Sequence, residues 1–97
     1  MSTLPAPEIE KQLKRLSQWK LEGNAIRKQF TFAGFPQAVA FVNALVPEAE
    51  AADHHPDILI NYKRVTLTYS THSEGGLTDK DFAGAAIADR VAALFAG

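Results

Sequence analysis

Cysteine is absent from this chain of 97 residues, which excludes a disulfide framework and any zinc site built on thiolates. Long apolar runs are also absent, since no stretch approaches the roughly 18 apolar residues that a membrane span requires. A run of one charge is missing too, because ten basic and eleven acidic residues are interspersed along the chain. Nucleic-acid binding needs a dense Lys/Arg face. We therefore expect neither a nucleic acid nor a membrane as partner.

The amino-terminal segment lacks the basic residues and apolar run of a secretion signal. Met1 is followed by polar sequence with Pro5 and Pro7. Together with the absence of cysteine, this indicates a cytoplasmic protein, because a protein without disulfides suits a reducing compartment. A chain of this length has room for one hydrophobic core, which predicts a single domain over residues 1–97.

Apolar residues recur at helical spacing in three segments and alternate with polar residues in four others. The spacing predicts strands at residues 19–22, 26–32, 58–62 and 64–70, and helices at residues 7–17, 36–52 and from about 78 nearly to the C-terminus. Pro47 lies inside the second helix. Because proline removes a backbone donor and clashes with the preceding turn, we expect a kink or a break near Val46.

The resulting order, α-β-β-α-β-β-α, predicts an α+β fold with two layers. Its four-stranded antiparallel sheet would carry three helices on one face. No helix is left to cover the other face, so a partner subunit is the simplest cover. A domain of this size buries only roughly 65% of its unfolded surface, and association would stabilise it. We expect a homo-oligomer.

All three histidines of the chain lie in one stretch of sequence. His54 and His55 follow the second predicted helix and precede Pro56, and His72 follows the fourth predicted strand. If that strand continues, His72 shares its polar Thr/Ser face. Imidazole exchanges protons near neutral pH, so three imidazoles where secondary structure ends indicate acid/base chemistry on a small uncharged or polar substrate.

Acidic residues accompany these histidines. Glu50 and Asp53 would lie on the last turn of the second helix, on the same side, where the helix dipole disfavours them. Thr78 and Asp81 form a capping signature before the last helix. Each feature alone also fits ordinary solvated loop or surface charge. Adjacent histidines rarely bind one ion together, and no His-x-His or His-x-x-x-His spacing occurs, so we expect no metal site.

The combined pattern resembles the pterin-4a-carbinolamine dehydratase family. The resemblance covers nearly the whole chain, including Trp19, and the spacing of His-His-Pro and Thr-His together is specific. Its motifs are Glu50-x-x-Asp53-His54-His55-Pro56, Tyr62, Val65, Thr71-His72 and Gly76-Leu77-Thr78-x-x-Asp81. Ile58 stands where many members have tryptophan. The family's fold is similar to the one expected above, and its members assemble as dimers or tetramers.

The resemblance implies a hydro-lyase that needs no metal and no cofactor. Its reaction would convert 4a-hydroxytetrahydropterin (4a-hydroxytetrahydrobiopterin) to quinonoid dihydropterin and water, which recycles the tetrahydropterin cofactor of aromatic amino acid hydroxylases. Which histidine is the acid and which the base stays open. The residues it implies are His54, His55 and His72 as catalytic histidines and Glu50, Asp53 and Asp81 as substrate-binding acids.

Two non-catalytic roles are the alternatives. Some relatives are dimerisation partners of transcription factors, and others have lost catalytic residues and serve as enzyme assembly factors. Such binding modules would use a helix face rather than the histidines. The presence of all three histidines and both neighbouring acids favours the enzyme.

Overall fold

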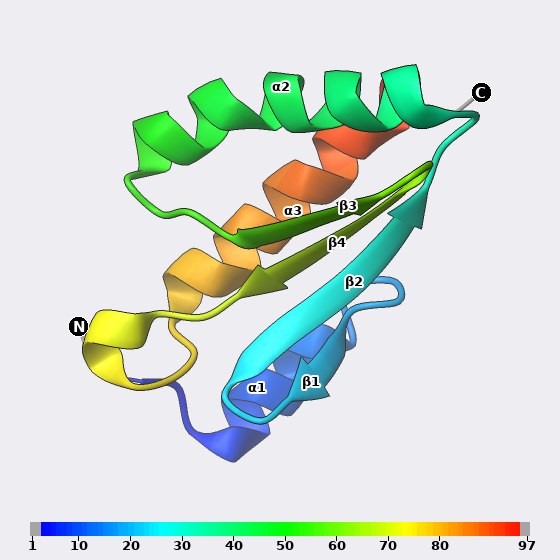
Figure 1. Cartoon of the computed structure of the whole chain (residues 1–97). Helices are drawn as coiled ribbons and strands as arrows, with labels where there is room; N and C mark the ends of the chain where they lie inside the picture. The colour runs from blue at the N-terminus through cyan, green and yellow to red at the C-terminus, as the bar shows by residue number, and fades with distance from the viewer. Residues whose placement is uncertain (1–2, 96–97) are drawn as a thin grey trace.

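A four-stranded sheet forms one layer of the structure, a computed structural model that describes residues 3–95, and three helices form the other (Figure 1). The strands are β1 (Lys20–Glu22), β2 (Ala25–Thr31), β3 (Asp57–Asn61) and β4 (Arg64–Tyr69). The helices are α1 (Ala6–Leu13), α2 (Phe35–Ala52), α3 (Asp79–Ala93) and a short 3-10 helix, η1 (His72–Glu74).

Two antiparallel hairpins, β1–β2 and β3–β4, meet through β2 and β4, which gives the strand order β1-β2-β4-β3. The register places Ile26 opposite Tyr69 and Phe30 opposite Val65. All three helices lie on the same side of this sheet (Figure 1). The predicted α+β class, element order and antiparallel sheet are confirmed.

Strand alternation builds the core. In β4, the side chains of Val65, Leu67 and Tyr69 are buried beneath the helices, together with Phe41 and Leu45 of α2. Full burial of a side chain of this size contributes about 1.5–3 kcal/mol relative to exposure. Packing of these β4 residues against Phe41 and Leu45 therefore fixes α2 on the sheet. It also fixes the positions of the α2–β3 turn and of the start of α3.

The face of the sheet without helices is largely polar, because the residues that alternate with the core there are Arg27, Gln29, Thr66 and Thr68. Such a face needs little apolar cover. The edge strand β3 and the turn after it expose the apolar side chains of Ile58, Leu59, Ile60 and Tyr62, and Leu59, which lies opposite Thr66, is on this face.

Helix α2 continues through Pro47, so of the kink or break expected near Val46, the break is wrong. The proline lies on the exposed side of the helix, where water can bond the carbonyl that it leaves free. Burial of Phe41 and Leu45 on the other side holds the helix together. Helix α1 is shorter than expected and ends at Leu13.

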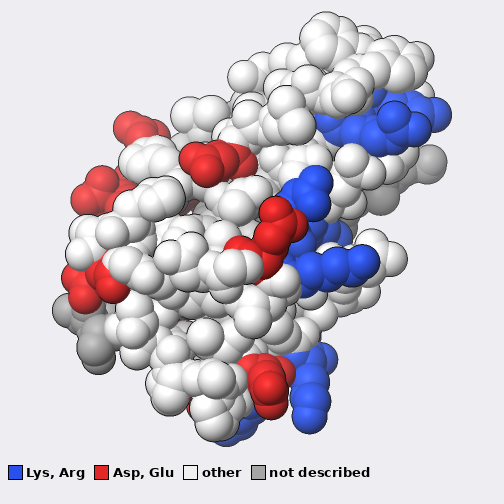
Figure 2. Space-filling model, turned by 60° about the horizontal axis from the view of Figure 1, so that its bottom comes forward, with Lys and Arg blue, Asp and Glu red and all other residues white. Residues whose placement is uncertain are grey.

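Charges are mixed over the face seen in Figure 2. Basic side chains gather toward one side of it and acidic side chains toward the other, with wide uncharged areas between them. This face offers no dense Lys/Arg surface of the kind that nucleic acid requires. Within residues 3–95, no helix combines the length and the apolar character needed to cross a bilayer.

A mostly buried ion pair ties α3 to the sheet. Lys28 Nζ lies 2.7 Å from Asp89 Oδ1, and Trp19 Nε1 donates to Asp89 Oδ2 at 3.0 Å. The side chains of Lys28 and Asp89 are 13% and 28% exposed. Loss of the carboxylate charge would leave the ammonium with little water and no anion, a costly arrangement.

We expect Asp89→Asn to lower the free energy of unfolding by about 2 kcal/mol, because a partly buried charge loses its partner. Urea denaturation would measure the loss. Glu22→Gln is the matched control, since it removes the exposed ion pair with Arg27 and should cost under about 1 kcal/mol. Equal losses in the two variants would contradict a structural role for the Asp89 pair.

Candidate active site

Helix α2 ends in a turn that brings His54 and His55 beside α3. Asp53 has left-handed backbone angles, φ 50° and ψ 42°. Its N–H donates to the Glu50 carbonyl at 3.2 Å, and the His54 N–H donates to the Ala49 carbonyl at 3.2 Å. These two bonds form a Schellman motif, with aspartate in the position that glycine usually takes. Asp53 thus turns the chain, and within residues 3–95 its exposed carboxylate has no hydrogen-bond partner.

The start of α3 supplies the second part of the site. The Thr78 N–H donates to Asp81 Oδ2 at 2.9 Å, and the Lys80 N–H donates to Thr78 Oγ1 at 3.3 Å. The predicted capping box is therefore present. It satisfies donors that a helix start leaves free, and it places the Asp81 carboxylate at the positive end of the helix dipole.

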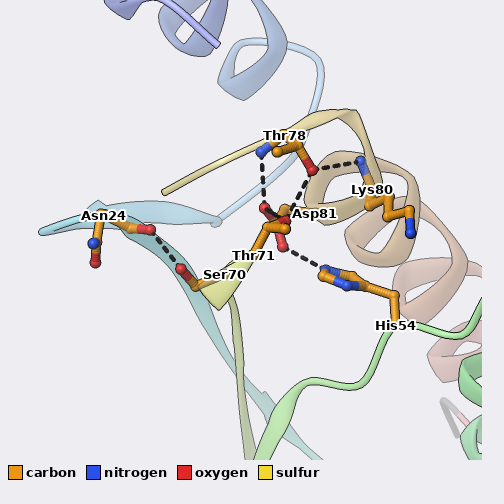
Figure 3. Close-up of polar contacts among 7 residues, drawn as sticks. All are labelled: Asn24, His54, Ser70, Thr71, Thr78, Lys80 and Asp81. Atoms are coloured by element: carbon orange, nitrogen blue, oxygen red, sulfur yellow. Dashed lines mark hydrogen bonds and ion pairs between the residues drawn. The ribbon is translucent and has the colours of Figure 1, made fainter. Parts of the chain in front are cut away.

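Asp81 is fully buried, with 0% of its surface exposed. Its Oδ2 also accepts from Thr71 Oγ1 at 2.8 Å, and its Oδ1 lies 2.6 Å from His54 Nε2 (Figure 3). Thr71 and Thr78 are joined through their hydroxyl oxygens at 2.8 Å. Since Thr71 spends its one hydrogen on Asp81, Thr78 must donate to Thr71. Every bond in this network then has one donor and one acceptor.

The network fixes the orientation of the His54 ring. With Asp81 as the acceptor, Nε2 of His54 carries a hydrogen, and Nδ1 is the nitrogen left for other chemistry. Within residues 3–95, Nδ1 has no partner, and the His54 side chain keeps 11% of its surface exposed. This arrangement, a buried carboxylate behind an imidazole, prepares a group for proton exchange at one nitrogen.

Tyr69 lies against the same imidazole. The two rings are 6.0 Å apart at their centroids and inclined by 22°. Burial and, to a smaller extent, the negative charge of Asp81 raise the pKa of Tyr69 to about 12. A Cβ atom at Gly84 would lie 2.6 Å from Cε1 of this tyrosine, so the absence of a side chain there lets the ring rest on α3.

His55 belongs to a second, more open pair. Its Nε2 lies 2.5 Å from Glu50 Oε2, and its side chain is 54% exposed. The pair borders a cavity of about 210 Å³ lined by Leu45, Val46, Ala49, Glu50, His55, Pro56 and Ile58. A smaller cavity of about 80 Å³ adjoins His54 and is lined by Leu45, Glu48, Ala49, Ala52, His54, Tyr69, Lys80, Ala83, Gly84 and Ile87.

His72 is not on the polar face of β4, because that strand ends at Tyr69 and the histidine begins η1. The prediction assumed that the strand continued. Instead, Thr71 makes an isolated bridge to Gly76, and the chain turns away. His72 is exposed and lines neither of the two cavities beside the other histidines.

The structure therefore joins His54 to Asp81 and His55 to Glu50, while Asp53 and His72 stand apart. No group of three or more His, Asp or Glu side chains suited to a metal occurs in residues 3–95. Sequence reasoning missed Thr71 and Tyr69 as site residues. Alternation along β4 shows that Tyr69 faces the helices, but only the fold shows which side chain it meets.

Comparison with known proteins gives consistent matches. A family model described as Pterin 4 alpha carbinolamine dehydratase matches residues 2–91. A protein of Chloroflexus aurantiacus named "Putative pterin-4-alpha-carbinolamine dehydratase" is 50% identical over 91 residues, which are 94% of this chain and 98% of that protein. A protein of the same name from Roseiflexus castenholzii is 52% identical over 84 residues, 87% and 90% of the two chains.

Two solved structures share the fold. A transcriptional coactivator/pterin dehydratase from Brucella melitensis has a TM-score of 0.90 and 34% identity, and the match covers 94% of this chain and 99% of that one. A pterin dehydratase-like protein identified as a RuBisCO assembly factor in the alpha-carboxysome has a TM-score of 0.64 and 27% identity, covering 76% and 86%.

The buried tyrosine generates a prediction about alkaline stability. The pKa of Tyr69 is about 12 in the folded chain and exceeds the ordinary value of 10.0. The protonated tyrosine therefore contributes its full share to the free energy of unfolding below pH 10. The free energy of unfolding should then fall by up to about 3 kcal/mol between pH 10 and 12, because the unfolded chain releases the tyrosine proton at lower pH than the folded chain does.

Urea unfolding across this range should show a smaller fall for Tyr69→Phe than for the parent. Tyr62→Phe, which alters the exposed tyrosine of the β3–β4 turn, should follow the parent. Parallel curves for all three proteins would contradict the prediction.

Proposed function

The chain belongs to the pterin 4 alpha carbinolamine dehydratase family, and from this premise we propose that it is an enzyme that dehydrates 4a-hydroxytetrahydropterins, 4a-hydroxytetrahydrobiopterin among them. The product would be the quinonoid dihydropterin, and the role would be tetrahydropterin recycling beside an aromatic amino acid hydroxylase in the cytoplasm. The observation that carries the proposal is the buried Asp81 carboxylate held 2.6 Å from His54.

The reaction requires two proton transfers. The C4a–O bond breaks with its electron pair on oxygen, which needs a proton to leave as water. The N5 lone pair forms the C4a=N5 double bond, and the N5 proton passes to a base. Two imidazoles, each beside a carboxylate, suit this pair of tasks, because a nearby carboxylate orients an imidazole for proton exchange. The reaction needs no metal and no cofactor.

The site residues divide into two groups in this proposal. His54 and His55 exchange protons with the substrate, and the cavity beside His55 receives the flat pterin ring against Pro56 and Ile58. His72, at the start of η1, is the third catalytic histidine in this proposal, as the family resemblance implies.

The acids have supporting tasks. Asp81, which has no exposed surface, acts through His54 rather than by touching the substrate. Glu50 holds His55 and, being exposed, is also free to meet the substrate. Asp53 shapes the turn that carries both histidines and presents its carboxylate at the surface.

The alternative is a non-catalytic binding module. It is supported by the pterin dehydratase-like RuBisCO assembly factor, and in part by the structure described as a transcriptional coactivator/pterin dehydratase. Two complete imidazole–carboxylate pairs favour the enzyme, since a binding surface has no need of a buried one. A dehydration assay on the purified protein separates the two functions.

Two substitutions of His54 should separate catalysis from folding. Both His54→Ala and His54→Gln should lower the dehydration rate by about 10²–10⁴-fold over the uncatalysed background, since an acid/base group is lost. Only the alanine variant should lose about 1–3 kcal/mol of stability, because the glutamine amide can still donate to the buried Asp81.

His55→Ala should lower the rate at a stability cost under about 1 kcal/mol, because the pair with Glu50 is exposed. Steady-state kinetics and urea denaturation measure both properties. Dehydration rates equal to the parent's in all three variants would contradict the assignment of the site to His54 and His55.

We also expect the protein to be a homodimer or homotetramer. The edge strand β3 exposes Ile58, Leu59 and Ile60 beside unpaired backbone groups, an arrangement that favours association. Light scattering at micromolar concentration should give a mass of at least two chains, and Leu59→Lys should lower it. A monomeric parent would refute this expectation.

A further inference from the structure

The hydroxyl of Tyr69 is the polar group that the roles above leave unused. The side chain is 2% exposed, and within residues 3–95 the hydroxyl has no hydrogen-bond partner. Yet no side-chain nitrogen or oxygen in these residues is both sealed from solvent and unpartnered. The small remaining surface of Tyr69 must therefore include its hydroxyl, and the residue lines the 80 Å³ cavity, so we infer that the hydroxyl opens into it.

This cavity lies between α2, α3 and β4, and its walls are mostly apolar. Its polar lining comes from His54 and Tyr69, with Glu48 and Lys80 also bordering it. Liquid water takes about 30 Å³ per molecule, so a space of about 80 Å³ suits two or three waters. Two or more polar groups around such a space are what an ordered water requires.

Resting on the dehydratase function, we propose that this cavity receives the water that leaves the substrate, and that the Tyr69 hydroxyl donates a hydrogen bond to its oxygen. His54, with a proton on Nδ1 besides the one that Nε2 donates to Asp81, delivers the Nδ1 proton to the leaving oxygen as the C4a–O bond breaks, and the electron pair of that bond stays on the oxygen. The N5 proton passes to the base of the other pair, His55 and Glu50. The oxygen then enters the cavity between the imidazole and the phenol.

The position of the phenol favours this role. Gly84 lets the ring approach α3 closely, and the centroid of the neighbouring imidazole lies 6.0 Å from that of the ring, so the hydroxyl is held before the reaction begins. A donor that needs no reorganisation stabilises charge that develops during the reaction more than a mobile one does. Because Tyr69 has a pKa of about 12, it keeps its proton at physiological pH and can donate throughout.

Tyr69→Phe tests the role, because it keeps the ring and removes one oxygen. We expect kcat to fall by about 10- to 100-fold with little change in KM, since the bond forms as the oxygen leaves. Tyr62→Phe is the matched control and should retain the parent's kcat. Ala83→Leu, which fills the cavity from α3 and alters neither histidine pair, should also lower kcat.

A crystal structure of the parent gives a readout besides activity and should show an ordered water within about 3.2 Å of the Tyr69 hydroxyl. An active parent with a parent-like kcat for Tyr69→Phe overturns the role of the tyrosine alone. A loss confined to KM overturns it too, because the hydroxyl would then bind the substrate rather than the leaving water. A parent with no dehydration above background overturns the proposed function and this role with it.

Discussion

Burial of the Asp81 carboxylate is the constraint on which the site depends. An ionised group without water is tolerated only when its oxygens accept hydrogen bonds, and here three different segments provide the donors. Thr78 comes from the start of α3, Thr71 from the chain after β4, and His54 from the turn after α2. Each segment is held to the others through one carboxylate, so the His54 imidazole is positioned by the same bonds that join these segments.

The same constraint separates the three histidines. His54 is bonded to a buried anion and has one orientation. His55 is exposed and is held by one bond, to Glu50. His72 is exposed, and no side chain among residues 3–95 bonds to its ring. A general acid benefits from a fixed position more than a binding group does, since proton transfer requires close approach. The difference in burial therefore supports unequal roles for residues that the sequence presents as equivalent.

Local patterns predict most of the fold, because each hairpin and helix has its own periodicity and each side of the sheet its own polarity. Pro47 misleads, since propensity alone ignores the packing of Phe41 and Leu45 that keeps α2 continuous. In the site, the adjacency of His54 and His55 and the capping box of Thr78 and Asp81 are visible in the sequence. Their meeting is not, because the two motifs are 27 residues apart and join only when α2 and α3 pack side by side. The contact between Tyr69 and His54 could not be predicted for the same reason.

The exposed edge strand β3 and the cavity beside His55 adjoin at one edge of the molecule. Ile58 belongs both to the exposed edge strand β3 and to the lining of the cavity beside His55. A second chain paired along β3 would therefore border that cavity and narrow its opening. Both partners of the His54–Asp81 pair come from one chain: Asp81 has no exposed surface, and the His54 side chain keeps 11% of its own. In the proposed dehydratase, proton exchange at His54 would thus be a property of the single chain, while a homo-oligomer would change the shape of the cavity beside His55.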